Sequence, residues 1–258
     1  MVYYVVSDVH GFYAELETAL GNAGYFEEHL PHKLIICGDF FDRGKEALKM
    51  QEFICELMRK DAVILVRGNH EDLALDLLRD FSEDLDVYAI PRHHISNGTF
   101  DTFMQLAKMS LTDVMINPEK LVKRVENSLF FKLIIPKSIN YFETQNFVFV
   151  HGWIPFVQRS FEKSYAEADW RNATEAAWKD ARWINGMQAY FMGAALPDKT
   201  IVCGHFHTSY GHSRVDGTPE FGDGADFSAF ADEGIIALDA CTAYSGRVNV
   251  LRIDDDDL

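Results

Sequence analysis

Five short segments of this chain combine aspartate, histidine, asparagine and arginine with glycine. They read SDVHG at 7–11, GDFFDRG at 38–44, RGNHE at 67–71, HG at 151–152 and GHFH at 204–207. Carboxylate, imidazole and amide side chains together form a ligand set that suits divalent ions such as manganese, iron or zinc. The residue types therefore indicate metal-assisted chemistry, provided that the fold brings the segments together.

Each segment directly follows an apolar run of strand length. The predicted strands cover 2–7, 33–37, 62–66, 147–150, 200–203, 235–238 and 248–253. Helical patterns at 13–23, 46–59 and 72–81 separate the early strands, and this alternation predicts a mainly parallel α/β sheet. Sites in such sheets form beyond the carboxyl ends of the strands. We therefore expect all five segments to meet at one rim.

The later part of the chain follows a different pattern. Its strands lie closer together, with a turn expected at 245–246, and they predict a second sheet. The stretch 82–140 contains mostly helical patterns, at 98–109 and 118–131, and we expect it to be an insertion within a single domain that spans 1–258. Another helical stretch is predicted at 165–183.

Composition limits the classes of partner. The 258 residues are 48% hydrophobic and carry a net charge of −16, which argues against a nucleic-acid partner because nonspecific binding needs a basic face. No apolar run approaches the length of a membrane span, and the N-terminus lacks the features of a signal peptide. Four cysteines without CxxC spacing fit buried, reduced thiols. We expect a soluble cytoplasmic protein with no membrane partner.

Charged side chains just beyond buried strands need compensating partners, because their desolvation is otherwise costly. Asp8 and His10 stand two apart at a strand end, so alternation points both side chains the same way. Asp39 follows the second strand, and its carboxylate could offer one oxygen to each of two ions. These placements favour a metal site over a set of hydrogen-bonded turns.

In type and order the segments resemble the signature of the calcineurin-like metallophosphoesterase superfamily, and specifically of the bacterial serine/threonine phosphoprotein phosphatases. That signature runs GDxHG, GDxVDRG and GNHE, followed by two later histidines. Here Ser7 and Phe41 replace the usual glycine and valine, and neither position is a ligand. The resemblance implies an α/β fold in which two mixed sheets form a β-sandwich flanked by helices, with the active site at the carboxyl ends of the strands.

The resemblance also implies a role for each residue of the segments. The implied metal ligands are Asp8, His10, Asp39, Asn69, His151 and His205. His207 is either a further ligand or none, because many protein phosphatases lack this second histidine. His70 resembles the general acid, and Asp42 the carboxylate that orients it. Phosphate-binding arginines are implied at Arg43, Arg67 and, through a looser alignment, Arg182.

The implied reaction uses two divalent ions, with manganese expected and iron or zinc as alternatives. Such ions stand about 3.5–4 Å apart and lower the pKa of a shared water. The resulting bridging hydroxide attacks phosphorus in line while His70 protonates the leaving group. A phosphorylated protein or a small phosphoester is the expected substrate.

Two other functions remain open. Close relatives hydrolyse dinucleoside polyphosphates such as diadenosine tetraphosphate, but they usually carry alanine where Asp42 stands and GNHD in place of the GNHE that ends at Glu71. Both residues favour a serine/threonine phosphatase, with phosphotyrosine as a further substrate. The other function is a catalytically silent metal-binding interaction module, which the presence of His70 and of every expected ligand argues against.

Overall fold

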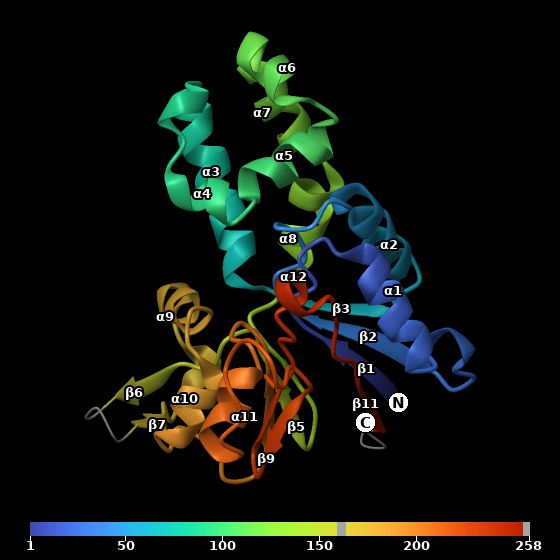
Figure 1. Cartoon of the computed structure of the whole chain (residues 1–258), viewed down its shortest axis with the longest axis vertical. Helices are drawn as coiled ribbons and strands as arrows, with labels where there is room; N and C mark the ends of the chain where they lie inside the picture. Colours follow the sequence, from blue (N-terminus) through green and yellow to red (C-terminus); the bar gives the residue numbers. More distant parts are fainter. Residues whose placement is uncertain (159–163, 255–258) are drawn as a thin grey trace.

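The computed structural model of the chain describes residues 1–158 and 164–254, which form two main sheets with helices around them (Figure 1). The first sheet has the strand order β11-β1-β2-β3. Its strands are β1 (Val2–Val6), β2 (His32–Cys37), β3 (Val63–Val66) and β11 (Leu251–Asp254). The first three are parallel, and β11 runs antiparallel along β1. The carboxyl ends of β1, β2 and β3 therefore reach the same edge.

The second sheet has the order β4-β5-β8-β10-β9. Its strands are β4 (Phe142–Glu143), β5 (Phe147–Phe149), β8 (Thr200–Cys203), β10 (Ile235–Ala237) and β9 (Phe230–Asp232). The central three are parallel, and the two edge strands are antiparallel to their neighbours. A small separate sheet pairs β6 (Phe156–Gln158) with β7 (Ser164–Ala166).

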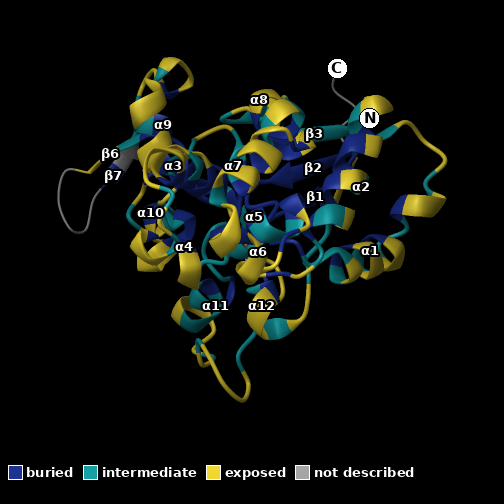
Figure 2. Cartoon of the chain, turned by 90° about the horizontal axis from the view of Figure 1, so that it is seen from above, coloured by how far each residue is buried: buried dark blue, intermediate teal, exposed yellow. Residues whose placement is uncertain are grey.

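The two main sheets pack face to face through one apolar cluster. Tyr3 and Val5 of β1 lie in it together with Phe149 of β5 and Val202 of β8. The alternate residues of β1 point the other way, into a second cluster beneath the helices. All of β1 is buried, because both faces of its sheet are covered, and Figure 2 shows β1 and β2 dark beneath partly exposed helices. The predicted two-sheet fold with flanking helices is confirmed.

Two helices join the strands of the first sheet, namely α1 (Tyr13–Asn22) and α2 (Ala47–Arg59). The chain between β3 and β4 is mainly helical and stands above both sheets in Figure 1. Its main helices are α3 (Asn69–Glu83), α4 (Arg92–Ser96), α5 (Thr99–Ala107), α6 (Leu111–Ile116), α7 (Pro118–Glu126) and α8 (Ile135–Lys137). That residues 82–140 form an insertion within a single domain stays a prediction.

Several predicted elements differ from those observed. The predicted helix at 165–183 is wrong over its first half, because Thr174 caps the helix there and α9 spans only Glu175–Ala181. The predicted helix at 118–131 ends at Glu126 and is followed by a π-helical turn at Phe130–Ile134. The strands that were not predicted are two or three residues long, too short to show periodicity.

Two of the remaining helices pack against the second sheet, and the third lies between β10 and β11. They are α10 (Gly186–Phe191), α11 (Ser209–Val215) and α12 (Thr242–Ser245), the last of which ends at the turn expected at 245–246. Across the described ranges, no helix combines the length and the apolar character needed to cross a bilayer.

A pH-dependent contribution to stability is expected at the edge strand β4. Arg171 Nε lies 2.8 Å from Glu143 Oε2, and Lys199 Nζ lies 3.0 Å from Oε1. The hydrogen bond from Arg171, helped by Lys199, lowers the pKa of Glu143 to about 2. Because the folded-state pKa is depressed, the stabilisation is fully present above the ordinary pKa of 4.5 and is lost as the pH falls toward 2.

We therefore expect Glu143→Gln to lower the free energy of unfolding by about 1 kcal/mol at neutral pH. The difference from the wild type should shrink between about pH 5 and pH 3, as the wild-type carboxylate begins to protonate. Urea unfolding across this range measures it, with the exposed Glu126→Gln as the matched control. A difference that does not change with pH would contradict the assignment.

Candidate active site

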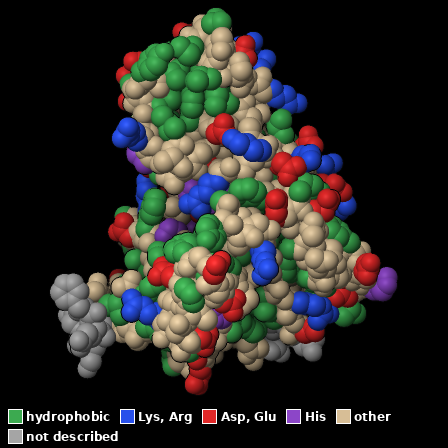
Figure 3. All heavy atoms as spheres, viewed as in Figure 1, with side chains coloured by type: hydrophobic (Ala, Val, Ile, Leu, Met, Phe, Trp, Pro, Cys, Tyr) green, Lys and Arg blue, Asp and Glu red, His purple; other side chains and the backbone are tan. Residues whose placement is uncertain are grey.

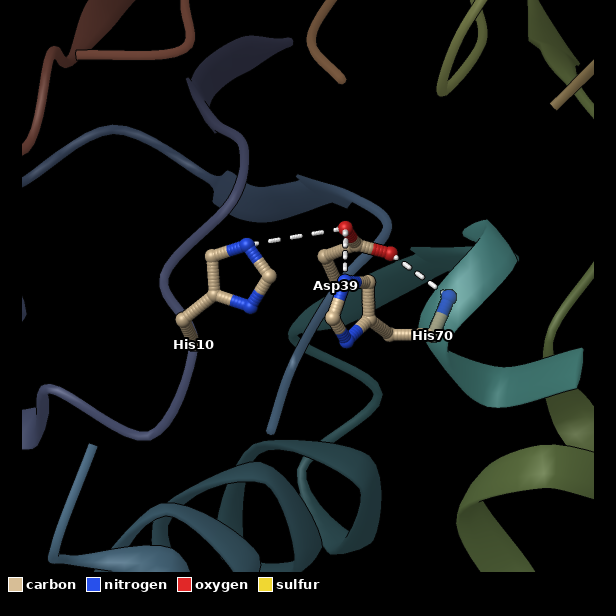
Figure 4. Close-up of side chains that lie close together, drawn as sticks. All are labelled: His10, Asp39 and His70. Atoms are coloured by element: carbon tan, nitrogen blue, oxygen red, sulfur yellow. Dashed lines mark hydrogen bonds and ion pairs between the residues drawn. The ribbon is translucent and has the colours of Figure 1, made fainter. Parts of the chain in front are cut away.

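Asp39, two residues beyond β2, belongs to two groups of possible metal ligands. Its Oδ2 is 3.6 Å from His10 Nε2, and its Oδ1 is 3.4 Å from His151 Nε2. Figure 4 shows the side that faces His10 and His70. In each group, His10–Asp39–His70 and Asp39–His151–His205, the candidate ligand atoms all lie within 4.8 Å of one another. The two oxygens of one buried carboxylate thus face different groups.

The first group lies beyond β1. His10 Nδ1 is 2.9 Å from the carbonyl oxygen of Phe41, so this nitrogen carries the proton and Nε2 presents a lone pair toward Asp39. Burial, followed by the nearby His70, lowers the pKa of His10 well below its ordinary value. His10 is therefore neutral, which is the form that binds metal. Asp8 Oδ1 lies 4.0 Å from the same Nε2.

The second group joins the two sheets. His151 follows β5, and its Nδ1 is held 2.8 Å from the carbonyl oxygen of Cys37, at the end of β2. Its Nε2 then points to Asn69 Oδ1 at 2.8 Å, and His205 Nδ1 reaches the same oxygen at 3.0 Å. Burial, followed by repulsion from the neighbouring imidazole of His151, lowers the pKa of His205 to about 3, so the imidazole of His205 is neutral as well.

His70 and Asp42 form a buried pair beside the first group. His70 Nδ1 lies 2.7 Å from Asp42 Oδ2, which leaves Nε2 facing Asp39 Oδ2 at 3.8 Å. Burial disfavours the charged imidazole, but the carboxylates of Asp39 and Asp42 outweigh it and raise the pKa of His70. A proton held on Nε2 would point toward the space next to Asp39.

The chemistry of these donors fits divalent cations. Burial raises the pKa of Asp39 well above its ordinary value, and the charge of Asp8 adds to this. The carboxylates of Asp8 and Asp39 are buried, and the free ring nitrogens of His10, His151 and His205 face them. Without positive charge between these groups, their burial costs free energy. Cations at the centres of the two groups would offset that cost. The described residues therefore contain two adjoining sets of side chains able to hold divalent metal ions.

Arg43 and Arg67, two of the predicted phosphate-binding arginines, differ in their contacts. Arg43 is exposed, and its Nη2 is 3.4 Å from His70 Nε2. Arg67 is half-buried, and it donates through Nε to Ser138 Oγ at 3.2 Å and through Nη2 to the carbonyl of Ile135. Figure 3 shows basic and histidine side chains gathered below the upper helices, where this face is hollowed.

Arg182 is placed differently from its expected role. It is only 2% exposed, and each of its three nitrogens donates to a protein oxygen. Nε bonds Asp72 at 2.7 Å, Nη1 bonds Asn140 at 2.7 Å and Nη2 bonds Glu175 at 2.8 Å. Phosphate binding by Arg182 would require these bonds to break, so the geometry favours a structural role that ties α9 to α3.

We expect Arg182→Met to lower the free energy of unfolding by about 3–5 kcal/mol, because it leaves the buried carboxylate of Asp72 without its partner. Urea unfolding measures this, with Arg79→Met as control, since Arg79 makes exposed ion pairs whose loss costs about 1 kcal/mol or less. A variant of wild-type stability with a raised KM for phosphate esters would restore the phosphate-binding role.

His207 belongs to neither of the two ligand groups. Its Nδ1 is 2.9 Å from Ser209 Oγ, and its Nε2 is 3.2 Å from Glu220 Oε1. Both nitrogens therefore have partners among the described residues. This arrangement favours the alternative in which His207 is not a ligand.

Glu71 accepts buried hydrogen bonds that the sequence analysis did not predict. Its buried carboxylate accepts hydrogen bonds from the backbone N–H groups of Gly68, Asp39 and Phe40, at 2.8, 3.0 and 3.0 Å. It thus ties the loop after β2 to the start of α3. The available signal was its position three residues after Gly68, where a capping glutamate is common at a helix start.

The backbone of the site is strained. Nine described residues other than glycine have a left-handed backbone, and six of these belong to the segments singled out from the sequence. These six are Asp8, His10, Asp39, Asp42, Arg43 and His205. Such a conformation costs about 1–3 kcal/mol for each residue and persists only where the surroundings impose it.

Comparison with known proteins supplies the family. The sequence model of the calcineurin-like phosphoesterases matches residues 1–231 of this chain. The chain belongs to the calcineurin-like phosphoesterase family. The predicted superfamily is therefore confirmed.

The similarity to curated relatives covers only part of this chain. The bis(5'-nucleosyl)-tetraphosphatase PrpE [asymmetrical] of Bacillus velezensis is 33% identical over 76 residues, which cover 27% of this chain and 30% of that protein. The symmetrical bis(5'-nucleosyl)-tetraphosphatase of Wigglesworthia glossinidia brevipalpis is 38% identical over 72 residues, covering 28% and 25%. The chain thus matches about a third or less of the length of these relatives.

A solved structure agrees over nearly the whole chain. The cold-active protein-tyrosine phosphatase of a psychrophilic Shewanella species superimposes with a TM-score of 0.53 at 16% identity, covering 99% of this chain and 76% of that one. At this identity the likeness concerns the fold alone.

Proposed function

We propose that this chain is a metal-dependent phosphoester hydrolase whose substrate is a phosphorylated serine or threonine in a protein, with phosphotyrosine as a further substrate. The observation that carries the proposal is the position of Asp39, whose two carboxylate oxygens face two separate groups of imidazole ligands. One carboxylate shared between two ions is an arrangement suited to a two-metal phosphatase.

The proposed ligands divide between two sites that share Asp39. Asp8 and His10 would hold one cation, and Asn69, His151 and His205 the other. Manganese is the proposed metal, because carboxylate and amide oxygens suit it. The imidazole nitrogens would suit iron or zinc as alternatives. Two such cations would supply Lewis acidity and offset the negative charge of the phosphate.

The side chains around the ligands would carry the rest of the reaction. His70 holds a proton on Nε2 for the departing oxygen, while Asp42 bonds Nδ1 and stabilises the charged imidazole. Arg43 lies next to Nε2 of His70 and is free to bind the phosphate oxygens. Arg67 can add its third nitrogen, Nη1, which lies 3.9 Å from Glu175 and has no closer partner among the described contacts.

A dinucleoside polyphosphate is the second candidate substrate, because the curated relatives are bis(5'-nucleosyl)-tetraphosphatases. The buried Asp42–His70 pair supports the first candidate instead. Proton donation matters most for an alkoxide, such as that of serine, which is a poorer leaving group than a nucleotide phosphate.

The decisive experiment compares a phosphoserine peptide with diadenosine tetraphosphate as substrates, in the presence of manganese. The proteins are the wild type, Asn69→Ala and the exposed control Asn22→Ala. A chelator should abolish turnover, and manganese should restore it in the wild type and the control only. Peptide turnover that depends on Asn69 would support the proposal.

The other outcomes are equally clear. Faster turnover of the dinucleotide would keep the two-metal mechanism and replace the protein substrate. Turnover of neither substrate, with metal still bound, would favour a catalytically silent metal-binding module. Equal activity in Asn69→Ala and the wild type would contradict the proposed ligand set.

A further inference from the structure

The Asp42–His70 pair has a third member that comes from the upper helices. Thr99 Oγ1 lies 2.7 Å from Asp42 Oδ2, the same oxygen that His70 Nδ1 reaches at 2.7 Å. Thr99 is 0% exposed and Asp42 is 2% exposed, so no solvent competes for the hydroxyl. Because the carboxylate can only accept, the threonine hydroxyl donates its hydrogen to Asp42.

Helix α5 holds Asp42 at two points. Thr99 is its first residue and bonds the carboxylate, while Thr102, one turn later on the same face, accepts the backbone N–H of Asp42 at 3.0 Å. Gly98 brings the helix start close, since a Cβ there would stand 2.5 Å from the backbone nitrogen of Arg43. Both the main chain and the side chain of Asp42 are thereby fixed against α5.

We propose that Thr99 is a positioning residue for proton donation: its hydroxyl fixes the Asp42 carboxylate so that Oδ2 faces His70 Nδ1. With Nδ1 engaged, the ring of His70 is oriented so that Nε2 faces the space between Asp39 and Arg43. Without the hydroxyl, the carboxylate can turn about its last torsion, and the imidazole loses this fixed direction. The role in catalysis rests on the function proposed above.

The test uses substrates that differ in their need for a proton. Phenyl phosphate has a basic leaving group that needs protonation, whereas 2,4-dinitrophenyl phosphate leaves readily as the anion. We expect Thr99→Val, which keeps the shape of the side chain, to lower kcat for phenyl phosphate by about tenfold, a part of the usual contribution of a general acid. For the dinitrophenyl ester the change should stay within about twofold, because no acid is required.

Two further variants separate positioning from folding. Thr99→Ser keeps the hydroxyl and should restore turnover of phenyl phosphate. Thr102→Val removes only the bond to the Asp42 backbone, so any loss should be equal for both esters. An equal loss for both esters in Thr99→Val, no loss at all, or failure of the serine variant to restore activity would overturn the proposal.

A spectroscopic measurement keeps this proposal distinct from the proposed function. The His70 Nδ1 proton, hydrogen-bonded to a buried carboxylate, should give a downfield proton resonance in the protein without paramagnetic ions. Thr99→Val should shift or broaden this resonance, and Thr99→Ser should not. If the wild type hydrolysed neither ester, the proposed function would fail, and an unaltered resonance in Thr99→Val would separately reject the positioning role.

Discussion

Asp39→Asn should reduce metal-dependent phosphatase activity by about a thousandfold or more, since metal ions contribute several kcal/mol to such transition states. Asp39 is the one residue in both candidate ligand groups of the described chain, with a different oxygen facing His10 and His151. An asparagine keeps the shape and one oxygen, but its amide NH2 cannot bind a cation. Both metal sites should therefore weaken at once.

The metal content of the purified variant should fall together with its activity. Its stability in chelator should not fall, because the carboxylate that is removed is buried and disfavoured there. The matched control is Asp61→Asn, another aspartate with a left-handed backbone, which lies at the surface beside Lys33. Retention of two ions and of activity within tenfold would reject the bridging role of Asp39.

His70→Asn should lower kcat for a phosphoserine peptide by about a hundredfold or more while leaving the metals bound, because general acids contribute about 10²–10⁴-fold. His70 also lies in the first candidate ligand group, so its role has to be distinguished from that of a ligand. The bond between Nδ1 and Asp42 and the exposed Arg43 next to Nε2 favour a proton donor.

Metal analysis of His70→Asn decides between these roles. Two bound ions with slow turnover would identify the general acid, and loss of one ion would make His70 a ligand. His29→Asn is the control, since this exposed histidine lies outside both groups. Activity close to that of the wild type would exclude both roles.

Much of the fold could be predicted because strand ends carry a strong local signal. The runs that end before Asp8, Asp39 and Asn69 are apolar and of strand length, and parallel strands bring their carboxyl ends to one edge. The same signal fails for β6 and β7, which have three residues each. The helical pattern likewise does not show where α9 begins, because only the cap at Thr174 marks its first turn.

The candidate site could be predicted less evenly. The residues that follow strands lie together, because the strands place them. The expected roles of Arg182 and His207 rest on the family resemblance alone. Their contacts with Asp72 and Glu220 depend on packing between distant segments, which the sequence does not report. Thr99 belongs to a helix whose position over Asp42 no local pattern reports. The left-handed backbone of Asp39 and His205 is likewise imposed by surroundings, not by residue type.

The candidate metal ligands around Asp39 come from both main sheets. Asp39 follows β2 of one sheet, whereas His151 and His205 follow β5 and β8 of the other. An ion held by these residues would link the two sheets, so metal binding would stabilise their packing against each other. Free metal at a hundred times its dissociation constant would add about 2.7 kcal/mol to the folded state. The concentration of free metal would then affect both the stability of the fold and the rate of catalysis.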